Sequence, residues 1–564
     1  MRTLAGILLV LVGVAITSAA ESPFCSGVYT WGTGSLDSLD VGALPPIRGV
    51  ALTYTWGEVE PRPGAFAFEE VIGRDLAQAA EKGLCVHLMI WTAPKTPRWL
   101  YENGVPEVAV PPRINPFRQE VTVTFPYYLD EDYARYFHRM IRAFGAFIQG
   151  LPDDLRARVT FVQSAEGSTG DGQPYKGEPI DAKYAITPEQ WDTFRTRTWD
   201  VYREALSKDG KQLLPILINP DNRRDAELDY VMKYMEPIAA KQGMFSHGYQ
   251  ISETIDRVTH WRAYEAQGLA LGKPSLTRGE QDGEWNICGW SKQNPEQAFY
   301  WSALFALHCG LDIWNIPLDA LESVEMDETV RFFNFHAGYQ TPESSPGAFC
   351  ALGRGLDASD TDLYPEDQFG EASRGNIARY VKIAEYFARY GAIQGDPPEA
   401  TGGGMRNRQA DDYNDVGWRI WPGNYETFLH QIDPDATSAA WWHVAPSKHR
   451  YSRFARSFEQ ASDKTRMGFY LDPGFFGDAT PQKVWVRVVY LDTGDGKWTL
   501  NYATPDGEAT AATVQNTDTG TWKSIEVALD DAVFSRALDA DADLALALID
   551  GADVTFHMVE LRRR

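Results

Sequence analysis

Two glutamates, Glu166 and Glu280, stand where apolar runs of sequence give way to glycine-rich turns. The first follows VTFVQSA and precedes GSTGDG; the second follows PSLTRG and precedes QDGEW. A buried parallel strand is a nearly continuous apolar run, so a charge at its exit marks the rim of the core. Two carboxylates on one rim can hydrolyse a glycosidic bond, one protonating the leaving oxygen and the other attacking or activating water.

A closed ring of parallel strands would bring both glutamates to the same rim. From about residue 47 to 317, strand-like runs alternate with amphipathic helical stretches, which predicts an α/β fold, a (β/α)8 TIM barrel. In this prediction Glu166 ends the fourth strand and Glu280 the seventh, at the end of the barrel where active sites lie. The eight expected strands are 47–56, 84–91, 121–125, 159–166, 212–219, 244–252, 274–280 and 311–317.

The sequence changes character after 394–411, a stretch rich in Gly, Pro and charge. Alternating segments such as KVWVRVVYLDTGDGKWTLNYATPDG then predict a smaller antiparallel β-sandwich, a candidate carbohydrate-binding domain. Four tryptophans in it offer a sugar-stacking platform, although aromatic residues in sandwiches more often pack in the core: Trp442, Trp485, Trp498 and Trp522. The expected domains are a signal peptide (1–20), the barrel (21–395), a linker (396–411) and the sandwich (412–564).

The N-terminal stretch MRTLAGILLVLVGVAITSAA is typical of a secretory signal, which predicts a secreted or periplasmic protein with no membrane attachment after cleavage. A formal charge of −25 over 564 residues argues against nucleic acid or an anionic membrane as a partner. Five scattered cysteines do not form a metal-binding pattern, and we expect no metal and no cofactor. Cys85 and Cys309 lie in apolar runs and are interpreted as small buried residues. The oligomeric state stays open.

Residues 56–100, WGEVEPRPGAFAFEEVIGRDLAQAAEKGLCVHLMIWTAPKTPRWL, resemble the first two strand units of clan A glycoside hydrolases, especially bacterial β-galactosidase-like enzymes. The shared pattern is W-x-x-x-E-P-x-x-G, followed by an apolar strand and a P-x-W-L turn. The resemblance implies that Glu166 is the acid/base, that Glu280 is the nucleophile and that configuration is retained.

One position departs from that family, because Ala165 stands where an Asn normally contacts the sugar. Gln163 or Ser164 would then make that contact, or the substrate differs, or Glu166 is not the acid. The rival carboxylates are Asp171 and Glu284; Glu280 is favoured over Glu284 because it directly follows its strand.

Aromatic and basic residues at other strand ends are candidates for substrate binding. The aromatic ones are Trp56, Trp91, Trp285 and Trp314, while Tyr249 and Arg278 are expected to keep Glu280 ionised. Cations gather near the same end and indicate a sulfated or uronic polysaccharide, unless they pair with nearby acids: Lys95, Arg98, Lys176, Arg223, Arg224 and Arg278. His87 and His247 lie within strands and are interpreted as core histidines.

Three functional classes therefore stay open: a retaining glycoside hydrolase of galactan-like or anionic chains, a polysaccharide lyase, and a non-catalytic carbohydrate-binding protein on a hydrolase-like barrel. The hydrolase is favoured. A lyase needs a base beside a group that neutralises the uronate charge, usually Tyr, His, Lys or a metal, and the sequence shows no metal-ligand cluster. A binding protein would tolerate the loss of either glutamate.

Overall fold

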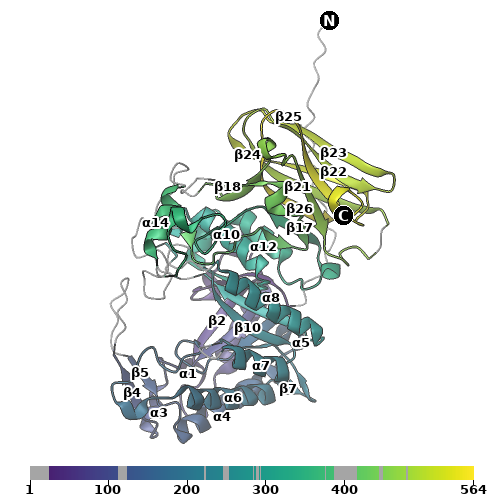
Figure 1. Ribbon diagram of the computed structural model, residues 1–564. Coiled ribbons are helices and arrows are strands. Elements are labelled where there is room, and N and C mark those ends of the chain that lie inside the picture. The colour runs from purple at the N-terminus through teal and green to yellow at the C-terminus, as the bar shows by residue number, and fades with distance from the viewer. Residues whose placement is uncertain are drawn as a thin grey trace.

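The computed structural model describes two connected folding units, a barrel and a sandwich (Figure 1). The residues described are 24–111, 123–220, 224–245, 253–281, 283, 285–286, 291–292, 294–374, 376–386, 416–443, 449–477 and 480–564. In these ranges no helix is both long and apolar enough to cross a membrane. The proposed signal peptide and linker lie outside them.

Eight parallel strands of the described chain form the barrel, which confirms the predicted fold class. Their order in the sheet is β10-β11-β12-β1-β2-β3-β6-β9, and a parallel bridge between Ile218 and Ala240 joins the last strand to the first. The strands are β1 (Gly27–Trp31), β2 (Gly49–Thr55), β3 (Cys85–Trp91), β6 (Val159–Gln163), β9 (Ile216–Leu217), β10 (Ile238–Met244), β11 (Ser275–Glu280) and β12 (Ile313–Pro317).

One expected strand was wrong and one barrel strand was not predicted, and these two errors cancel in the strand count. The first barrel strand is β1, which the sequence analysis missed, and the expected third strand is not in the barrel. Residues of that segment form β5 (Val123–Pro126), which pairs antiparallel with β4 (Glu107–Val110) in a separate hairpin. Because one strand was missed and one was added before it, β6 is still the fourth strand and β11 the seventh.

Two later strands are also displaced from their expected ranges. The fifth, β9, is only two residues long. The sixth, β10, ends where the predicted strand 244–252 begins, and residues 246–252 lie outside the described chain. Its sequence, IAAKQGM, has a low apolar content because Lys241 faces the polar end of the barrel interior, so the strand lacks the usual apolar signature.

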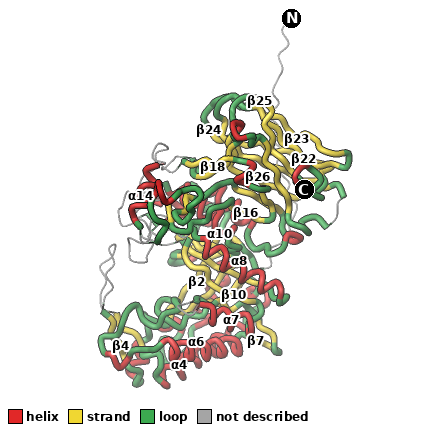
Figure 2. Tube along the Cα trace, viewed as in Figure 1, coloured by secondary structure: helices red, strands yellow, loops and turns green. Residues whose placement is uncertain are grey.

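Helices cover the outside of the barrel (Figure 2). Those between the strands are α1 (Trp56–Val59), α2 (Arg74–Glu81), α3 (Arg98–Glu102), α4 (Glu131–Gly150), α5 (Asp153–Arg156), α6 (Pro188–Ala205), α7 (Arg224–Tyr234), α8 (Ile255–Ala270) and α10 (Pro295–His308). After β12 follow α11 (Leu318–Ser323), α12 (Asp327–His336), α13 (Glu366–Phe369) and α14 (Ile377–Tyr386). Short strands also occur outside the barrel: β7 (Ser207–Lys208), β8 (Lys211–Gln212), β14 (Leu356–Asp357) and β15 (Val416–Gly417).

The C-terminal unit consists of two antiparallel sheets, as predicted. One sheet contains β13 (Gly347–Ala351), β16 (Tyr425–Thr427), β18 (Ala439–Trp442), β19 (Phe454–Ser457), β21 (Gln482–Asp492), β24 (Thr521–Ala532) and β26 (Thr555–Arg563). The other contains β17 (Leu429–Gln431), β20 (Arg466–Leu471), β22 (Lys497–Thr504), β23 (Gly507–Gln515) and β25 (Leu544–Asp550). Strand β13 precedes the range assigned to the sandwich, yet it pairs with β26 along its whole length.

The sandwich packs against α10, the helix between the seventh and eighth barrel strands (Figure 1). Every residue of α10 from Gln297 to His308 is buried, as expected for a helix that is apolar on all sides. Tyr300 OH lies 2.7 Å from His557 Nε2, and Gln297 Nε2 donates to the Ser452 carbonyl at 2.6 Å. These bonds fix the sandwich on the barrel.

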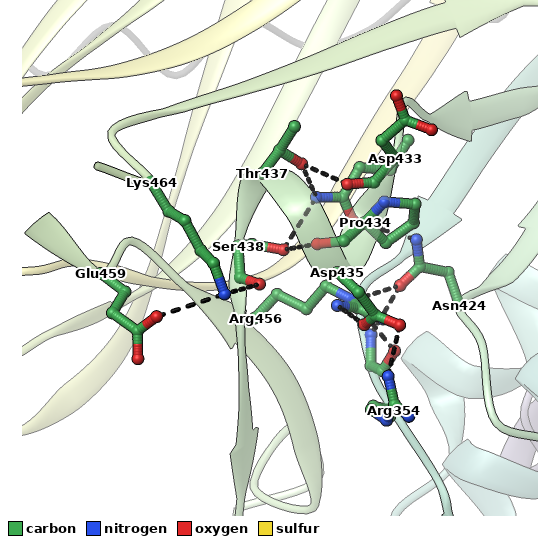
Figure 3. Close-up of polar contacts among 12 residues, drawn as sticks. Arg354, Asn424, Asp433, Pro434, Asp435, Thr437, Ser438, Arg456, Glu459 and Lys464 are labelled. Carbon is green, nitrogen blue, oxygen red and sulfur yellow. Dashed lines mark hydrogen bonds and ion pairs between the residues drawn. The ribbon is translucent and has the colours of Figure 1, made fainter. Parts of the chain in front are cut away.

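An ion-pair cluster anchors the short helix α15 (Pro434–Thr437) to the loop after β13 (Figure 3). Arg456 Nη1 lies 2.9 Å from Asp435 Oδ1, and Arg354 bonds the other oxygen of Asp435. Asn424 Oδ1 accepts from Arg456 Nε at 3.1 Å and from the Gly353 amide at 2.9 Å. Because the charged groups of this cluster pair with one another, we assign the cluster a structural role.

The four sandwich tryptophans do not share one exposed face. Trp498 is fully buried between the sheets, against Tyr490. Trp442 Nε1 donates to the Arg354 carbonyl, and Trp522 Nε1 donates to Ser452 near the barrel contact. Arg564 lies over the ring of Trp485.

A disulfide joins Cys25 to Cys85, at the starts of β1 and β3. The interpretation of Cys85 as only a small buried residue is therefore wrong, because it is half-buried and forms a disulfide. Its partner is 60 residues away and precedes the strand that the sequence analysis missed. Cys309 and Cys350 are buried and free, as expected for Cys309.

Candidate active site

The floor of the barrel interior is an apolar cluster that is separate from the main core. It takes one side chain from each of six strands: Tyr29, Phe161, Leu217, Ala239, Leu276 and Ile313. Side chains on a strand alternate between two faces, so residues two or four positions further along also face the interior. This rule places a second set above the floor, toward the carboxyl ends of the strands: Trp31, Gln163, Lys241, Arg278, Glu280 and Asn315.

Glu280 ends β11 and accepts two charged hydrogen bonds inside the barrel. Lys241 Nζ lies 2.7 Å from its Oε1, and Arg278 Nη2 lies 2.7 Å from its Oε2. Burial raises the pKa of this carboxyl, but Arg278 and Lys241 outweigh burial and lower the pKa to about 2. Glu280 is therefore ionised at neutral pH, and 23% of its side chain is exposed.

His87 lies on the interior face of β3 and closes the floor beneath this carboxylate. Its ring stacks on Phe161 with centroids 4.4 Å apart, and Asn315 Nδ2 donates to its Nε2 at 2.8 Å. Burial, and then the charge of Arg278, lower the pKa of His87 well below its usual value. The ring is therefore neutral and serves as a core histidine; His247 lies outside the described residues.

Six buried polar atoms of the interior residues have no hydrogen-bond partner in the part of the chain that the structure describes. Four are donors, Nε1 of Trp31 and of Trp91, Nδ1 of His87 and Nε of Arg278, and two are acceptors, Oε1 of Gln163 and Oδ1 of Asn315. Buried polar groups in proteins almost always have partners, so this set of unpaired interior atoms indicates a polar ligand or ordered water. Sugar hydroxyls both donate and accept, and tryptophan rings match the apolar faces of pyranoses.

Glu166 lies in different surroundings. Its side chain is 1% exposed, and its Oε2 accepts from Nε of Arg195, on helix α6, at 3.2 Å. The pKa of Tyr202, also on α6, is raised by burial and then by the charge of Glu166. β6 ends at Gln163, three residues before Glu166, and the contacts with Arg195 and Tyr202 show that the Glu166 side chain points toward helix α6. The hydrogen bonds and ion pairs of the described chain join Glu166 to Arg195 and Glu280 to Lys241 and Arg278, with none between the two glutamates.

Two of the predicted aromatic residues do not line the interior, because their side chains are fully buried in the helix layer. Trp56 packs against Trp99 and donates to Glu60 at 2.8 Å. Trp314 packs between Phe299 and Phe333. Both rings serve as packing between barrel and helices.

Of the other predicted binding residues, some lie in the barrel interior and others lie elsewhere. Trp91 ends β3 on the interior face, whereas Trp285 is 6% exposed and its Nε1 lies 3.4 Å from Asp319. Lys176 bonds Asp171 in the loop after β6. Tyr249 and the rival Glu284 lie outside the described residues.

The directions of two side chains show which residue could contact the sugar in place of the family Asn that Ala165 replaces. Gln163 faces the interior and keeps an unpaired Oε1. Ser164 faces away, and its Oγ donates to the Leu217 carbonyl at 3.4 Å. Gln163 is therefore the better placed of the two candidates.

Three interior residues were not predicted from the sequence, Trp31, Lys241 and Asn315. Trp31 ends the undetected strand β1, and the short run GVYTW before Gly32 was its only signal. Lys241 lies in the middle of β10, whose mixed sequence IAAKQGM gave no clear strand signal and so no signal of a charged interior partner.

A surface hollow of about 790 Å³ lies elsewhere, between the end of α6, the β7–β8 hairpin and the end of α7. These segments lead into the amino ends of the strands. Active sites of such barrels lie at the opposite, carboxyl end, where Glu280 is found.

These features define the class: a (β/α)8 barrel with an ionised carboxylate and buried, unpaired polar atoms toward the carboxyl ends of its strands. No family model and no curated protein matches the chain.

Solved structures similar to the chain include three sugar-active enzymes. They are the catalytic domain of a β-amylase from Paenibacillus polymyxa (12% identity, TM-score 0.36, 57% of this chain and 99% of that one), a β-galactosidase from Marinomonas ef1 (14%, 0.33, 55% and 59%) and an exo-β-1,4-mannosidase from an Opitutaceae bacterium (14%, 0.32, 55% and 59%). These neighbours are glycoside hydrolases. At such identities and scores, the fold assignment depends on the strands of this chain itself.

Proposed function

We propose that this protein is a retaining glycoside hydrolase in which Glu280 is the nucleophile. The observation that carries the proposal is the carboxylate of Glu280, kept ionised by Lys241 and Arg278 at the carboxyl end of the barrel. Unpaired donors and acceptors in the barrel interior support a polyhydroxylated ligand.

The reaction would proceed in two steps. A Glu280 oxygen attacks the anomeric carbon, and the bond to the leaving oxygen breaks as that oxygen receives a proton from a second carboxylic acid. Water then attacks the same carbon, gives a proton to the second carboxylate and releases Glu280. Two inversions leave the anomeric configuration unchanged.

The charges near the site support a neutral sugar better than an anionic one. Lys241 and Arg278 both bond Glu280, so a substrate anion would compete with it. Two of the other expected cations also have acidic partners, Arg98 with Glu107 and Lys176 with Asp171. A sulfated or uronic substrate is the second candidate.

A polysaccharide lyase has less support for the same reason. Its charge neutraliser would have to be a cation that now bonds Glu280, and in the described chain no group of His, Cys, Asp or Glu is arranged to hold a metal ion. A non-catalytic sugar-binding barrel is separated from a hydrolase only by activity.

We also propose that the protein is exported. The N-terminal stretch has the pattern of a secretory signal. The Cys25–Cys85 disulfide supports an oxidising compartment, where such bonds persist.

The test is hydrolysis by the purified full chain. Substrates are 4-nitrophenyl glycosides of galactose, glucose, mannose, xylose, fucose and glucuronate, with neutral and sulfated galactans, fucans and mannans. Glu280→Gln should lower kcat at least about 10³-fold, while the exposed control Glu81→Gln keeps the wild-type rate. Proton NMR of the first-formed product should show the substrate's anomeric configuration. No hydrolysis by wild type, or an active Glu280→Gln, would refute the proposal.

A further inference from the structure

We propose that Asp171, rather than Glu166, is the carboxylic acid that protonates the leaving group, an inference that rests on the proposed function. Both residues follow β6, the fourth barrel strand, but their surroundings differ. The Glu166 side chain is 1% exposed, whereas that of Asp171 is 39% exposed. A proton donor has to reach the substrate, which the buried group cannot do in this structure.

The loop between these residues folds back over the barrel interior. The Gly170 carbonyl accepts from Gln163 Nε2 at 3.2 Å and from Asn219 Nδ2 at 2.9 Å. A Cβ added to Gly170, whose φ is +74°, would lie 2.5 Å from the sulfur of Met89. Gln163 and Met89 are both interior residues, so the loop lies on top of the polar interior, and Asp171 is the next residue.

Backbone bonds hold Asp171 in this position. Its amide donates to the Ser168 carbonyl at 3.0 Å, and the Thr169 amide donates to the Ala93 carbonyl at 2.8 Å, beyond the end of β3. Trp191 Nε1 donates to the Gly172 carbonyl at 2.6 Å. A catalytic group on a loop needs such fixation to stay in a productive geometry.

Lys176 stabilises the ionised form of Asp171, which is the form that acts as the base in the second step. Its ammonium bonds the Asp171 carboxylate. When Asp171 gives its proton to the departing oxygen, a cation in contact stabilises the carboxylate that remains. In the second step that carboxylate takes a proton from the attacking water, so the proton balance closes over the cycle.

Glu166 is then a positioning residue. Arg195, which it bonds, also contacts Glu227 and donates through Nη2 to the Asn219 carbonyl at 2.7 Å. Asn219 in turn bonds the Gly170 carbonyl. Glu166 thus acts on the loop through Arg195 and Asn219, without contact with the substrate.

Leaving-group dependence separates the two roles. The probes are the 4-nitrophenyl and 2,4-dinitrophenyl glycosides of the sugar that wild type cleaves fastest. Asp171→Asn should lower kcat/KM at least about 100-fold on the first probe and less than about 10-fold on the second, whose leaving group needs no proton. Sodium azide should restore the turnover of Asp171→Ala and yield a glycosyl azide, because azide attacks without a general base.

Glu166→Gln and Glu227→Gln should slow both probes by the same factor, and azide should not rescue them. Asp181→Asn, an exposed control beyond the same loop, should match wild type. Leaving-group dependence in Glu166→Gln would overturn the inference, as would its absence from Asp171→Asn. An active Glu280→Gln would instead refute the proposed function, so the two failures are distinguishable.

Discussion

Arg278 and Glu280 lie two positions apart on β11, so both side chains face the barrel interior and Arg278 Nη2 is 2.7 Å from Glu280 Oε2. One strand therefore carries both the candidate nucleophile and one of the cations that keep it ionised. Lys241, on the neighbouring strand β10, supplies the second cation. Substitution of a cation on either strand should therefore change the ionisation of Glu280.

Replacing Arg278 should move the acidic limb of the pH profile of kcat/KM to higher pH. The pKa of Glu280 is lowered to about 2 against the effect of its burial. Without one cation that pKa should rise by about one unit or more, so the reactive carboxylate is lost at a higher pH. The measurement is the kcat/KM profile of Arg278→Met, with the exposed Arg331→Met as control. An unmoved limb with a reduced plateau would show that Arg278 acts only in packing.

Trp31 and Trp91 should bind substrate through both their rings and their Nε1 groups. Substitution of either by Ala should lower kcat/KM about 10- to 100-fold, which corresponds to the loss of one stacking contact and one hydrogen bond. Trp→Phe at the same positions should recover part of the loss, because the ring remains and the donor does not. Trp485→Ala, in the sandwich, is the matched control. Equal rates for wild type and both Ala variants would exclude these residues from the site.

The barrel could be predicted because its strands and helices leave strong local patterns. The run VTFVQ forms β6 within the expected strand 159–166, which ends three residues later, and the amphipathic segment EDYARYFHRMIRAFGAFIQG forms α4. Strand β1 could not be recognised, because five residues before a glycine-rich turn carry little periodicity. Strand β9, with two paired residues, is held by its neighbours rather than by its own sequence.

The candidate site was predicted in part. Glu280 and Arg278 are two residues apart on one strand, so both side chains face the interior. This spacing can be read from the sequence alone. The direction of Glu166 depends on how the chain leaves β6, and its partner Arg195 lies 29 residues further on, so the sequence did not reveal it. Lys241 pairs with Glu280 across two strands, and such a contact depends on the sheet register.

Loss of the Cys25–Cys85 disulfide should destabilise the barrel by about 2–5 kcal/mol, because it closes a long loop of the unfolded chain. The measurement is urea unfolding of wild type and of the double variant Cys25→Ser, Cys85→Ser, each with and without reductant. Reductant should weaken wild type to the level of the double variant and leave that variant unchanged. The same response in both proteins would show that another thiol is responsible.

His430, in the sandwich, should make stability fall with rising pH. Its Nδ1 lies 2.9 Å from Glu426 and its Nε2 3.0 Å from Asp472. Burial lowers the pKa of His430, but the bonds to Asp472 and Glu426 outweigh burial and raise the pKa to about 9. A raised pKa in the folded state means that the contribution is complete below pH 6.5, the ordinary value, and is lost as pH rises to about 9.

The expected loss over that interval is about 1 to 3 kcal/mol, at about 1.4 kcal/mol for each pKa unit with some screening by solvent. It is measured as the free energy of unfolding in urea at pH 6 and at pH 9. His430→Gln should be less stable at pH 6 and should lose this part of the pH dependence. His449→Gln is the control, because burial lowers the pKa of His449 and its titration falls below pH 6.5. If the free energy of unfolding of His430→Gln falls between pH 6 and pH 9 as much as that of wild type, other groups cause the alkaline loss of stability.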